Sequence, residues 1–161
     1  MDISFDIRGF LKPYEKVRTD LESVKNAFVT PFGANSSRHE LYNKLLEYNN
    51  KLSDLLEREA YSQWINGSFI SLKESPRDID LVSFISSDIV SRNQVELQSY
   101  IGEKGRKKFG IDGYIVKVYS EDHAHFVRTK SDYLYWEHWF GWSRKNRRRE
   151  RFQKGFIEIL F

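Results

Sequence analysis

Two acidic residues, Asp78 and Asp80, stand two positions apart in a segment rich in Ile, Leu, Val and Phe. On a β-strand, residues with this spacing point to the same face, so the two carboxylates would converge on one point. Neighbouring carboxylates repel each other, and a divalent cation with oxygen ligands is the usual way to offset that repulsion. The spacing therefore predicts a metal site at one edge of a strand.

Upstream of this pair, Gly67 and Ser68 follow a short apolar segment, and we expect them to open a helix. Glycine lets the backbone come close to a phosphate, and the amides at a helix N-terminus point at anions. Ordinary turns also contain Gly-Ser, and a strand with one solvated face also alternates as the segment from Asp78 does. The order and separation of the Gly-Ser pair and the two aspartates together indicate a phosphoryl-transfer site.

Residues 64–85 thus contain an apolar strand, a Gly-Ser pair, nine further residues and an Asp-Ile-Asp-Leu segment. This order resembles the signature of the polymerase-β-like nucleotidyltransferases, and the likeness extends over roughly residues 64–120. Beyond it, Ser-Ser-Arg at 36–38 before a long helix, and Asn-Gly-Ser-Phe at 66–69, resemble an uncharacterised group of bacterial nucleotidyltransferase-like proteins.

Carried over residue by residue, the resemblance implies that Gly67 and Ser68 hold the β- and γ-phosphates of a nucleoside triphosphate. Asp78 and Asp80 would bind Mg²⁺, for which Mn²⁺ could substitute. The further candidates for contact with the phosphates are Lys73 and Arg77.

The third carboxylate of this two-metal site is expected on a neighbouring strand, and two residues compete for it. Asp112 opens the next apolar segment and shares a strand face with Tyr114, but Gly113 follows it where the family usually has a hydrophobic residue. Glu158, between two isoleucines near the end of the chain, is the alternative. Asp112 could also be a turn residue, because the residues around it favour turns.

The reaction that the resemblance implies is transfer of a nucleoside monophosphate from a triphosphate to an acceptor hydroxyl on RNA, tRNA or a protein. Asp78, Asp80 and Asp112 would be the catalytic residues. Some small members of the superfamily are toxins restrained by an antitoxin, so a toxin-type enzyme with a partner protein falls within the prediction. The competing interpretation is an inactive module of the same fold that binds RNA or a protein.

The net charge is +3, but residues 144–154 contain seven basic residues and one acidic residue. Such runs usually form solvated faces or connectors. In a protein that handles nucleic acid they would also grip the phosphate backbone. The candidate RNA contacts are Arg144, Arg147, Arg148, Arg149 and Arg151.

Aromatic residues before this run allow two interpretations. Trp136, Trp139 and Trp142 could be core residues or could stack on a nucleotide base. His123 and His125 alternate and could bind a transition metal, but no further Cys or His stands beside them, so a polar loop is the favoured interpretation.

A length of 161 residues without cysteine predicts one domain that uses no disulfide and no thiolate metal site. The N-terminus lacks a basic region followed by an apolar run, and no apolar stretch has membrane-spanning length. We therefore expect no membrane segment and a cytoplasmic location.

Hydrophobic periodicity predicts an α/β (α+β) fold with a small mixed central sheet, packed helices and a nucleotidyltransferase-like core. We expect a helical part at about 1–60, a catalytic core at about 61–120, and an aromatic and basic part with a final strand at 121–161. Capping-box patterns predict helices at about 19–28 and 37–60. Expected next are strands at about 62–66, 78–85, 111–119 and 155–161, a short helix from Gly67, and helices at about 91–103 and 133–140.

Overall fold

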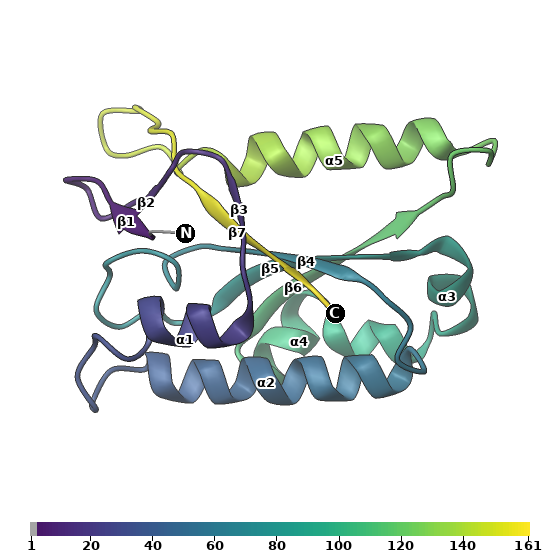
Figure 1. Cartoon of the computed structure of the whole chain (residues 1–161), viewed down its shortest axis with the longest axis horizontal. Coiled ribbons are helices and arrows are strands. Elements are labelled where there is room, and N and C mark those ends of the chain that lie inside the picture. Colours follow the sequence, from purple (N-terminus) through teal and green to yellow (C-terminus); the bar gives the residue numbers. More distant parts are fainter. Residues whose placement is uncertain (1–2) are drawn as a thin grey trace.

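A five-stranded mixed sheet crosses the middle of the molecule in the computed structural model, which describes residues 3–161 (Figure 1). Across the sheet, the strands follow the order β3 (Lys16–Arg18), β7 (Phe156–Leu160), β4 (Ser62–Asn66), β5 (Ile79–Ser86) and β6 (Ile111–Val118). β7 runs parallel to β3 and antiparallel to β4, while β5 runs antiparallel to β4 and parallel to β6. The predicted α/β (α+β) class with a mixed central sheet is confirmed.

Helices cover both faces of this sheet. In Figure 1, α1 (Leu21–Phe28), α2 (Arg38–Leu55) and α4 (Gly102–Phe109) lie below the sheet, and α5 (Phe126–Phe140) lies above it. The remaining short helices, α3 (Ser87–Arg92) and a 3₁₀ turn at Glu96–Tyr100, lie in the chain between β5 and α4. The result is a layered arrangement in which a residue's strand face decides which helix it meets.

The face toward α2 is apolar. Leu45, Tyr48 and Leu52 of α2 are fully buried, and the ring of Tyr48 meets those of Tyr100 and Phe109 with centroids 5.3 Å away in each case. Burial of one such leucine side chain stabilises a fold by ~1.5–3 kcal/mol. This packing fixes the position of β5 and β6, the strands that carry the acidic residues.

The face toward α5 is aromatic at one end and acidic at the other. Trp64 of β4 contacts Phe84 of β5 and Tyr133 of α5, with ring centroids 4.6 and 5.6 Å away. Asp80 and Asp112 share this face with Phe84 because side chains alternate along a strand. The carboxylates therefore lie where α5 has ended and no longer covers the sheet.

The N-terminal part differs from the prediction of a helical segment. It contains a hairpin of β1 (Ser4–Phe5) and β2 (Leu11–Lys12), and then β3, an outer strand of the main sheet. These strands have two or three residues each, too few to show a period of two. α1 is also capped one residue later than predicted. Asp20, not Thr19, accepts a bond from the Ser23 amide at 2.7 Å, because the Thr19 amide is bonded to β7.

Other helix boundaries were wrong as well. α2 ends at Leu55 rather than near residue 60, because Glu57 and Arg58 adopt positive φ. No helix spans 91–103. α3 ends at Arg92, and α4 begins only at Gly102, whose φ of +54° prevents a continuous helix. α5 begins at Phe126, before the predicted start. The strands predicted near 62–66, 78–85, 111–119 and 155–161 are confirmed.

Candidate functional site

Asp78, Asp80 and Asp112 lie at the N-terminal ends of the neighbouring parallel strands β5 and β6. Asp80 is the register partner of Asp112, and Asp78 immediately precedes β5. Asp112 is on a strand and buried, so the turn interpretation was wrong. The spacing of two between Asp78 and Asp80 and the pairing of β5 with β6 together place three carboxylates in one neighbourhood.

The electrostatics of Asp80 are unfavourable to its charge. Burial raises the pKa of its carboxyl group above the usual value, and the nearby charges of Asp78 and Asp112 raise it further. Arg144 opposes this effect, with its Nη2 atom 4.0 Å from Oδ1 of Asp80, and so does Lys154. An additional cation at this position would stabilise the ionised form.

Arg106, on α4, holds the other two carboxylates. Its Nε atom lies 3.4 Å from Oδ2 of Asp78, and its Nη2 atom donates to Oδ2 of Asp112. The bond to Asp112 raises the pKa of Arg106, so the guanidinium remains charged. One side chain therefore reaches both acids, and it would have to release them before a metal ion could use the same oxygens.

Opposite the carboxylates, β4 ends in a turn at Gly67 and Ser68. The helix predicted from Gly67 is absent, and the segment forms a turn and bend instead. Gly67 has φ +80°, and a Cβ atom built there would lie 1.9 Å from Oδ2 of Asp80. Only glycine fits this backbone so close to the carboxylate. The turn and Asp80 are thus in direct contact across the pair Asn66–Asp80.

A buried arginine lies beneath this turn and determines its shape. Arg38, at the start of α2, is 0 % exposed. Its guanidinium donates to five backbone carbonyls, those of Phe28, Ser68, Phe69, Ser71 and Lys73. Burial lowers its pKa to about 10, so it keeps its charge at neutral pH. The segment 68–73 is therefore wrapped around a cation.

Arg38 has no anionic partner, since none of the ion pairs formed by Asp or Glu within residues 3–161 involves it. Buried charges are normally paired. Because the carbonyls of Ser68 and Phe69 point at Arg38, the amides of the same peptide groups point away from it. These amides belong to Phe69 and Ile70, which are buried and do not line the cleft. What favours an anion beside Gly67 and Ser68 is therefore the positive charge of Arg38 beneath the turn.

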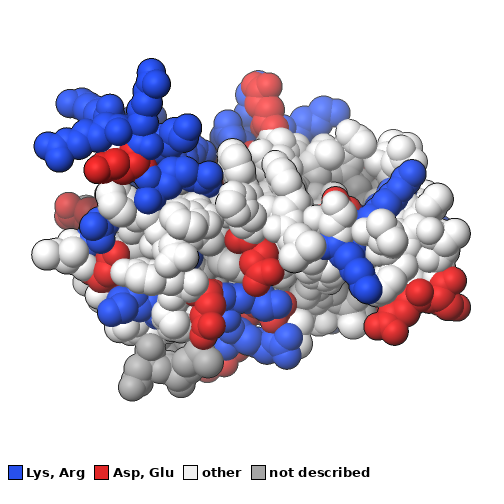
Figure 2. All heavy atoms as spheres, turned by 90° about the horizontal axis from the view of Figure 1, so that it is seen from above, with Lys and Arg blue, Asp and Glu red and all other residues white. Residues whose placement is uncertain are grey.

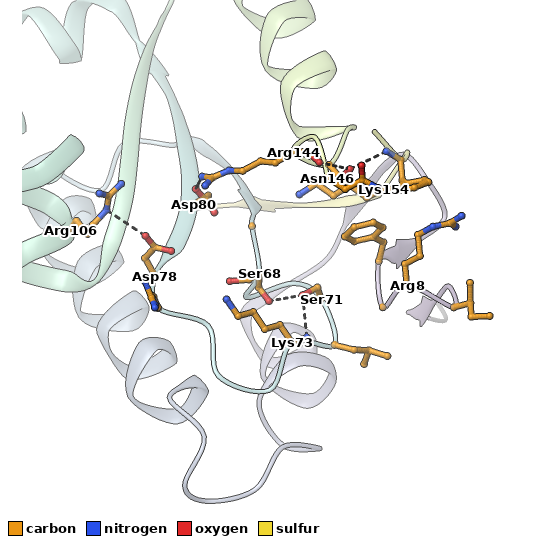
Figure 3. Close-up of a pocket in the computed structure, with 18 residues that line it drawn as sticks. Arg8, Ser68, Ser71, Lys73, Asp78, Asp80, Arg106, Arg144, Asn146 and Lys154 are labelled. Atoms are coloured by element: carbon orange, nitrogen blue, oxygen red, sulfur yellow. Dashed lines mark hydrogen bonds and ion pairs between the residues drawn. The ribbon is translucent and has the colours of Figure 1, made fainter. Parts of the chain in front are cut away.

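A cleft of about 1150 Å³ joins the turn to the carboxylates. Figure 3 shows Asp78 and Asp80 on the left of it, beside Arg106. Ser68 and Lys73 lie in the lower middle, and Arg144 and Lys154 lie along the top. The predicted residues that line it are Gly67, Ser68, Lys73, Arg77, Asp78, Asp80 and Arg144. Asp112 does not line the cleft, because it lies behind Arg106. The N-terminal hairpin closes one end through Arg8 and Phe10.

The basic run after α5 folds as a hairpin-like excursion, here called the basic hairpin (residues 142–154). Its two arms are joined by a bridge between Trp142 and Gln153 and by a bond from the Ser143 amide to the Phe152 carbonyl. Figure 2 shows a dense group of basic side chains at this end of the molecule. Of the predicted RNA contacts, Arg144 and Arg151 face pockets, whereas Arg147, Arg148 and Arg149 are exposed at the tip.

Glu158, the alternative third carboxylate, lies elsewhere. It is on β7, two strands away from β5, and its register partner on β4 is Trp64. Its carboxylate accepts from Nε1 of Trp64 at 3.0 Å and from Nε of Arg18 at 2.7 Å. Burial pushes the pKa of Glu158 up, but these bonds and that from Lys16 lower it overall. Its oxygens are used within the fold, which leaves Asp112 as the better candidate.

Three residues of the site had not been singled out from the sequence as site residues: Arg38, Arg106 and Lys154. The Nζ atom of Lys154 donates to Oδ1 of Asn66 at 2.7 Å, and burial lowers the pKa of Lys154 to about 8. The sequence signals were weak. Arg38 appeared only as part of a Ser-Ser-Arg triplet, and the other two were members of basic clusters.

His123 and His125 are exposed and lie near Tyr119, with centroids 4.7 and 5.4 Å from its ring. Within residues 3–161, no three Asp, Glu, His or Cys side chains stand close enough to hold a metal ion in their present positions. In the same range there is no apolar helix of the length that a bilayer crossing requires.

Comparison with known proteins gives one match. No curated protein and no solved structure matches the chain. One protein family, described as a family of unknown function (DUF6932), matches residues 3–160. Because this match covers almost the whole length, the chain belongs to the DUF6932 family.

Proposed function

We propose that the protein is a Mg²⁺-dependent nucleotidyltransferase that moves a nucleoside monophosphate from a nucleoside triphosphate to an acceptor hydroxyl. The observation that carries the proposal is the cleft itself. An anion-favouring turn backed by Arg38 stands against a group of carboxylates that favours a cation, and Gly67 contacts Asp80 directly. A triphosphate with its metal ion supplies both charges at that spacing. The reaction would take place in the cytoplasm.

The chain's own residues would act mainly by position. The turn at Gly67 and Ser68 and the side chains of Lys73 and Arg77 would bind the β- and γ-phosphates. Asp78 and Asp80 would hold Mg²⁺. Asp112 would become a further ligand once Arg106 releases its carboxylate and pairs with a phosphate instead. Carboxylate oxygens are the donors that Mg²⁺ prefers, so the residues present fit the ion. The ion, when bound, would neutralise charge on the phosphates and lower the pKa of the acceptor hydroxyl.

The bond changes balance without a covalent enzyme intermediate. The acceptor oxygen bonds to the α-phosphorus, the bond from that phosphorus to the bridging oxygen of the β-phosphate breaks, and pyrophosphate leaves. The proton of the acceptor hydroxyl passes to a carboxylate, for which Asp112 is the candidate. Arg144 and Lys154 lie beside Asp80, where they would stabilise charge on the transferred phosphoryl group.

The test is incubation of the purified protein with each α-³²P-labelled triphosphate and Mg²⁺ or Mn²⁺, alone and with total RNA or a cell extract as acceptor. We expect label on a macromolecule and release of pyrophosphate. Asp78→Asn and Asp80→Asn should each abolish the transfer while the fold persists. Equal transfer by the wild type and both variants would refute the assignment.

The second candidate is a catalytically inactive module of the same fold that binds RNA or a protein partner such as an antitoxin. The observation in its favour is that Arg106 already pairs with Asp78 and Asp112. If that pairing is permanent, isothermal calorimetry should show no Mg²⁺-dependent nucleotide binding at all. Mg²⁺-dependent binding of any triphosphate would exclude it.

A further inference from the structure

A second pocket opens beside the cleft, at the C-terminal end of α5, with a volume of about 310 Å³. This size is at the lower end for small-molecule sites, ~300 Å³. Ligands in the two spaces would meet at the same carboxylate, because the pocket shares with the cleft Gly67, Asp80, Ser143, Arg144 and Lys154. In Figure 3, Arg144 approaches Asp80 from the side opposite to Ser68 and Lys73. The pocket is therefore placed for the reactant that is not the triphosphate.

One wall of this pocket is aromatic. Trp139, in the last turn of α5, is 53 % exposed, and Trp142 lines the pocket next to it. Trp136 behaves differently, because it is buried against Tyr114 and Phe140 with ring centroids 4.9 and 5.3 Å away. Trp136 is thus a core residue, whereas Trp139 and Trp142 both line the cavity. Aromatic side chains in such a position can serve as stacking platforms for bases.

The remaining lining is strongly cationic. Arg144, Lys145, Arg151 and Lys154 face the pocket, and Asp80 is the one acid among its lining residues. The triphosphate already has the turn backed by Arg38, together with Lys73 and Arg77, on the other side. Arg144 and Lys154 line the cleft as well, whereas Lys145 and Arg151 line this pocket alone. These two further cations exceed what one triphosphate needs, whereas a polynucleotide brings further phosphates of its own.

We propose that this pocket holds the 3′-terminal nucleoside of a single-stranded RNA. The base lies against Trp139 and Trp142, the preceding phosphates lie near Lys145 and Arg151, and the 3′-hydroxyl faces Asp80. The assignment of this hydroxyl as the acceptor rests on the proposed nucleotidyltransferase function. Binding of the RNA end does not, because it needs neither a triphosphate nor a metal ion.

The experiment measures end-dependent binding without triphosphate or Mg²⁺. A fluorescent single-stranded 12-nucleotide RNA is compared, by anisotropy, with the same sequence closed into a circle. We expect the wild type to prefer the linear form. Trp139→Ala should weaken binding of the linear RNA about 5- to 150-fold, the loss of one stacked base, and remove the preference. Trp139→Phe should restore much of it.

Matched variants separate the pocket from the general surface. Leu134→Ala removes another exposed apolar side chain of α5, and Arg148→Gln removes a charge at the tip of the basic hairpin. Both should keep the preference for the linear RNA. Lys145→Gln, which removes a charge in the pocket, should reduce it.

Four results would overturn the proposal. The first two are equal affinity of the wild type for linear and circular RNA, and an unchanged preference for linear RNA in Trp139→Ala. The third is a Trp139→Ala variant that binds triphosphate more weakly but binds RNA as the wild type does. The fourth is a wild type that transfers label to a protein and does not bind RNA. A wild type that shows the Trp139-dependent end preference but transfers no nucleotide would support the pocket and count against the proposed function.

Discussion

At the scale of single residues, Asp80 connects the parts of the site. It is the register partner of Asn66 on one side and of Asp112 on the other, it contacts Gly67, and it lines both pockets. Its charge is disfavoured by burial and by its acidic neighbours. A carboxylate whose ionisation is disfavoured, and which lines two adjoining pockets, has the properties expected of a functional group.

The first prediction concerns the stability of the metal-free protein. Because the pKa of Asp80 is higher in the folded chain than in the unfolded chain, its ionisation lowers the free energy of unfolding as the pH rises through the folded-state pKa. Asp80→Asn should therefore raise the Tm in EDTA at neutral pH. The gain should shrink toward about pH 4, where the unfolded carboxyl group protonates. Calorimetric scans over this pH range provide the check, and a lower Tm of the variant at neutral pH would contradict the burial argument.

The second prediction uses two glycines. At Gly67 a Cβ atom would meet Asp80, and φ is +80°; at Gly33 a Cβ atom would meet nothing within 4 Å. Gly67→Ala should cost about 1–3 kcal/mol in unfolding free energy, as strained backbone positions do, and should abolish triphosphate binding. Gly33→Ala is the control and should leave both unchanged. Urea denaturation measures the unfolding free energy, and calorimetry measures triphosphate binding. Equal stability and equal affinity of the two variants would argue against a tight contact between the turn and Asp80.

The third prediction concerns Arg106, which bonds to Asp78 and Asp112. If a metal ion and the guanidinium compete for these oxygens, Arg106→Gln should tighten binding of Mn²⁺ alone. Titration followed by electron paramagnetic resonance measures the free ion. Lys107→Gln is a suitable control, because Lys107 pairs with Glu103 on the exposed side of α4. Weaker Mn²⁺ binding by the Arg106 variant would show that the guanidinium organises the acids instead of blocking them.

At the scale of elements, one side chain ties together four segments. Arg38, at the start of α2, bonds to the end of α1 through Phe28 and to residues 68–73, and its guanidinium carbon lies 3.8 Å from the centroid of the Phe32 ring. A helix terminus, an interhelical loop and the turn of the site are therefore coupled. The position of the turn therefore depends on Arg38 as well as on β4, the strand that precedes it.

The fourth prediction follows from this coupling. Arg38→Lys keeps a positive charge but has too few donors, in a compact geometry, for five carbonyls. Arg38→Met removes the charge as well. Both should lower the free energy of unfolding, by about 1–3 kcal/mol for each buried carbonyl left without a donor. If the charge favours a phosphate, the Met variant should bind triphosphate more weakly than the Lys variant at a temperature where both are folded. Equal affinities would mean that Arg38 only shapes the turn.

At the scale of the whole molecule, charge is separated from the apolar core. Residues 144–154 carry a net charge of +6, whereas the rest of the chain is net negative. Figure 2 shows Lys and Arg side chains gathered at one end of the molecule. The N-terminal hairpin and the basic hairpin flank the same opening, and Arg8 stacks on Phe152 at 4.1 Å. Segments from both ends of the chain therefore complete a site whose acids come from the middle.

The fifth prediction concerns the tip of the basic hairpin. Arg147, Arg148 and Arg149 are exposed and line neither pocket. The triple change to Gln should weaken binding of single-stranded RNA of any sequence, and it should reduce the slope of log K against log[salt] by about 2, from ~0.7 per lost phosphate contact. Triphosphate affinity should not change. Filter binding at several salt concentrations measures the slope, and an unchanged slope would identify the tip as a solvated surface without an RNA contact.

The sequence by itself determined the elements whose signal is local and long. The alternation in 78–85 and 111–119 and the stripe of α2 predicted their strands and helix, and the spacing of Asp78 and Asp80 predicted their common face. Boundaries failed where another part of the chain intervened. Thr19 continues the sheet through the Glu158 carbonyl, so α1 begins later than predicted. α2 begins where predicted, after Ser37, but the Ser37 hydroxyl donates to the Pro76 carbonyl and makes no capping bond to the helix.

Only the tertiary structure decided which residues complete the site. Asp112 meets Asp80 because β5 and β6 are parallel neighbours, and Glu158 does not because β7 lies beyond β4, where its oxygens are bonded. Lys154 reaches Asn66, and Arg38 reaches the turn, across gaps of 88 and about 30 residues in sequence. Contacts over such separations depend on strand order and on burial, which no local spacing encodes.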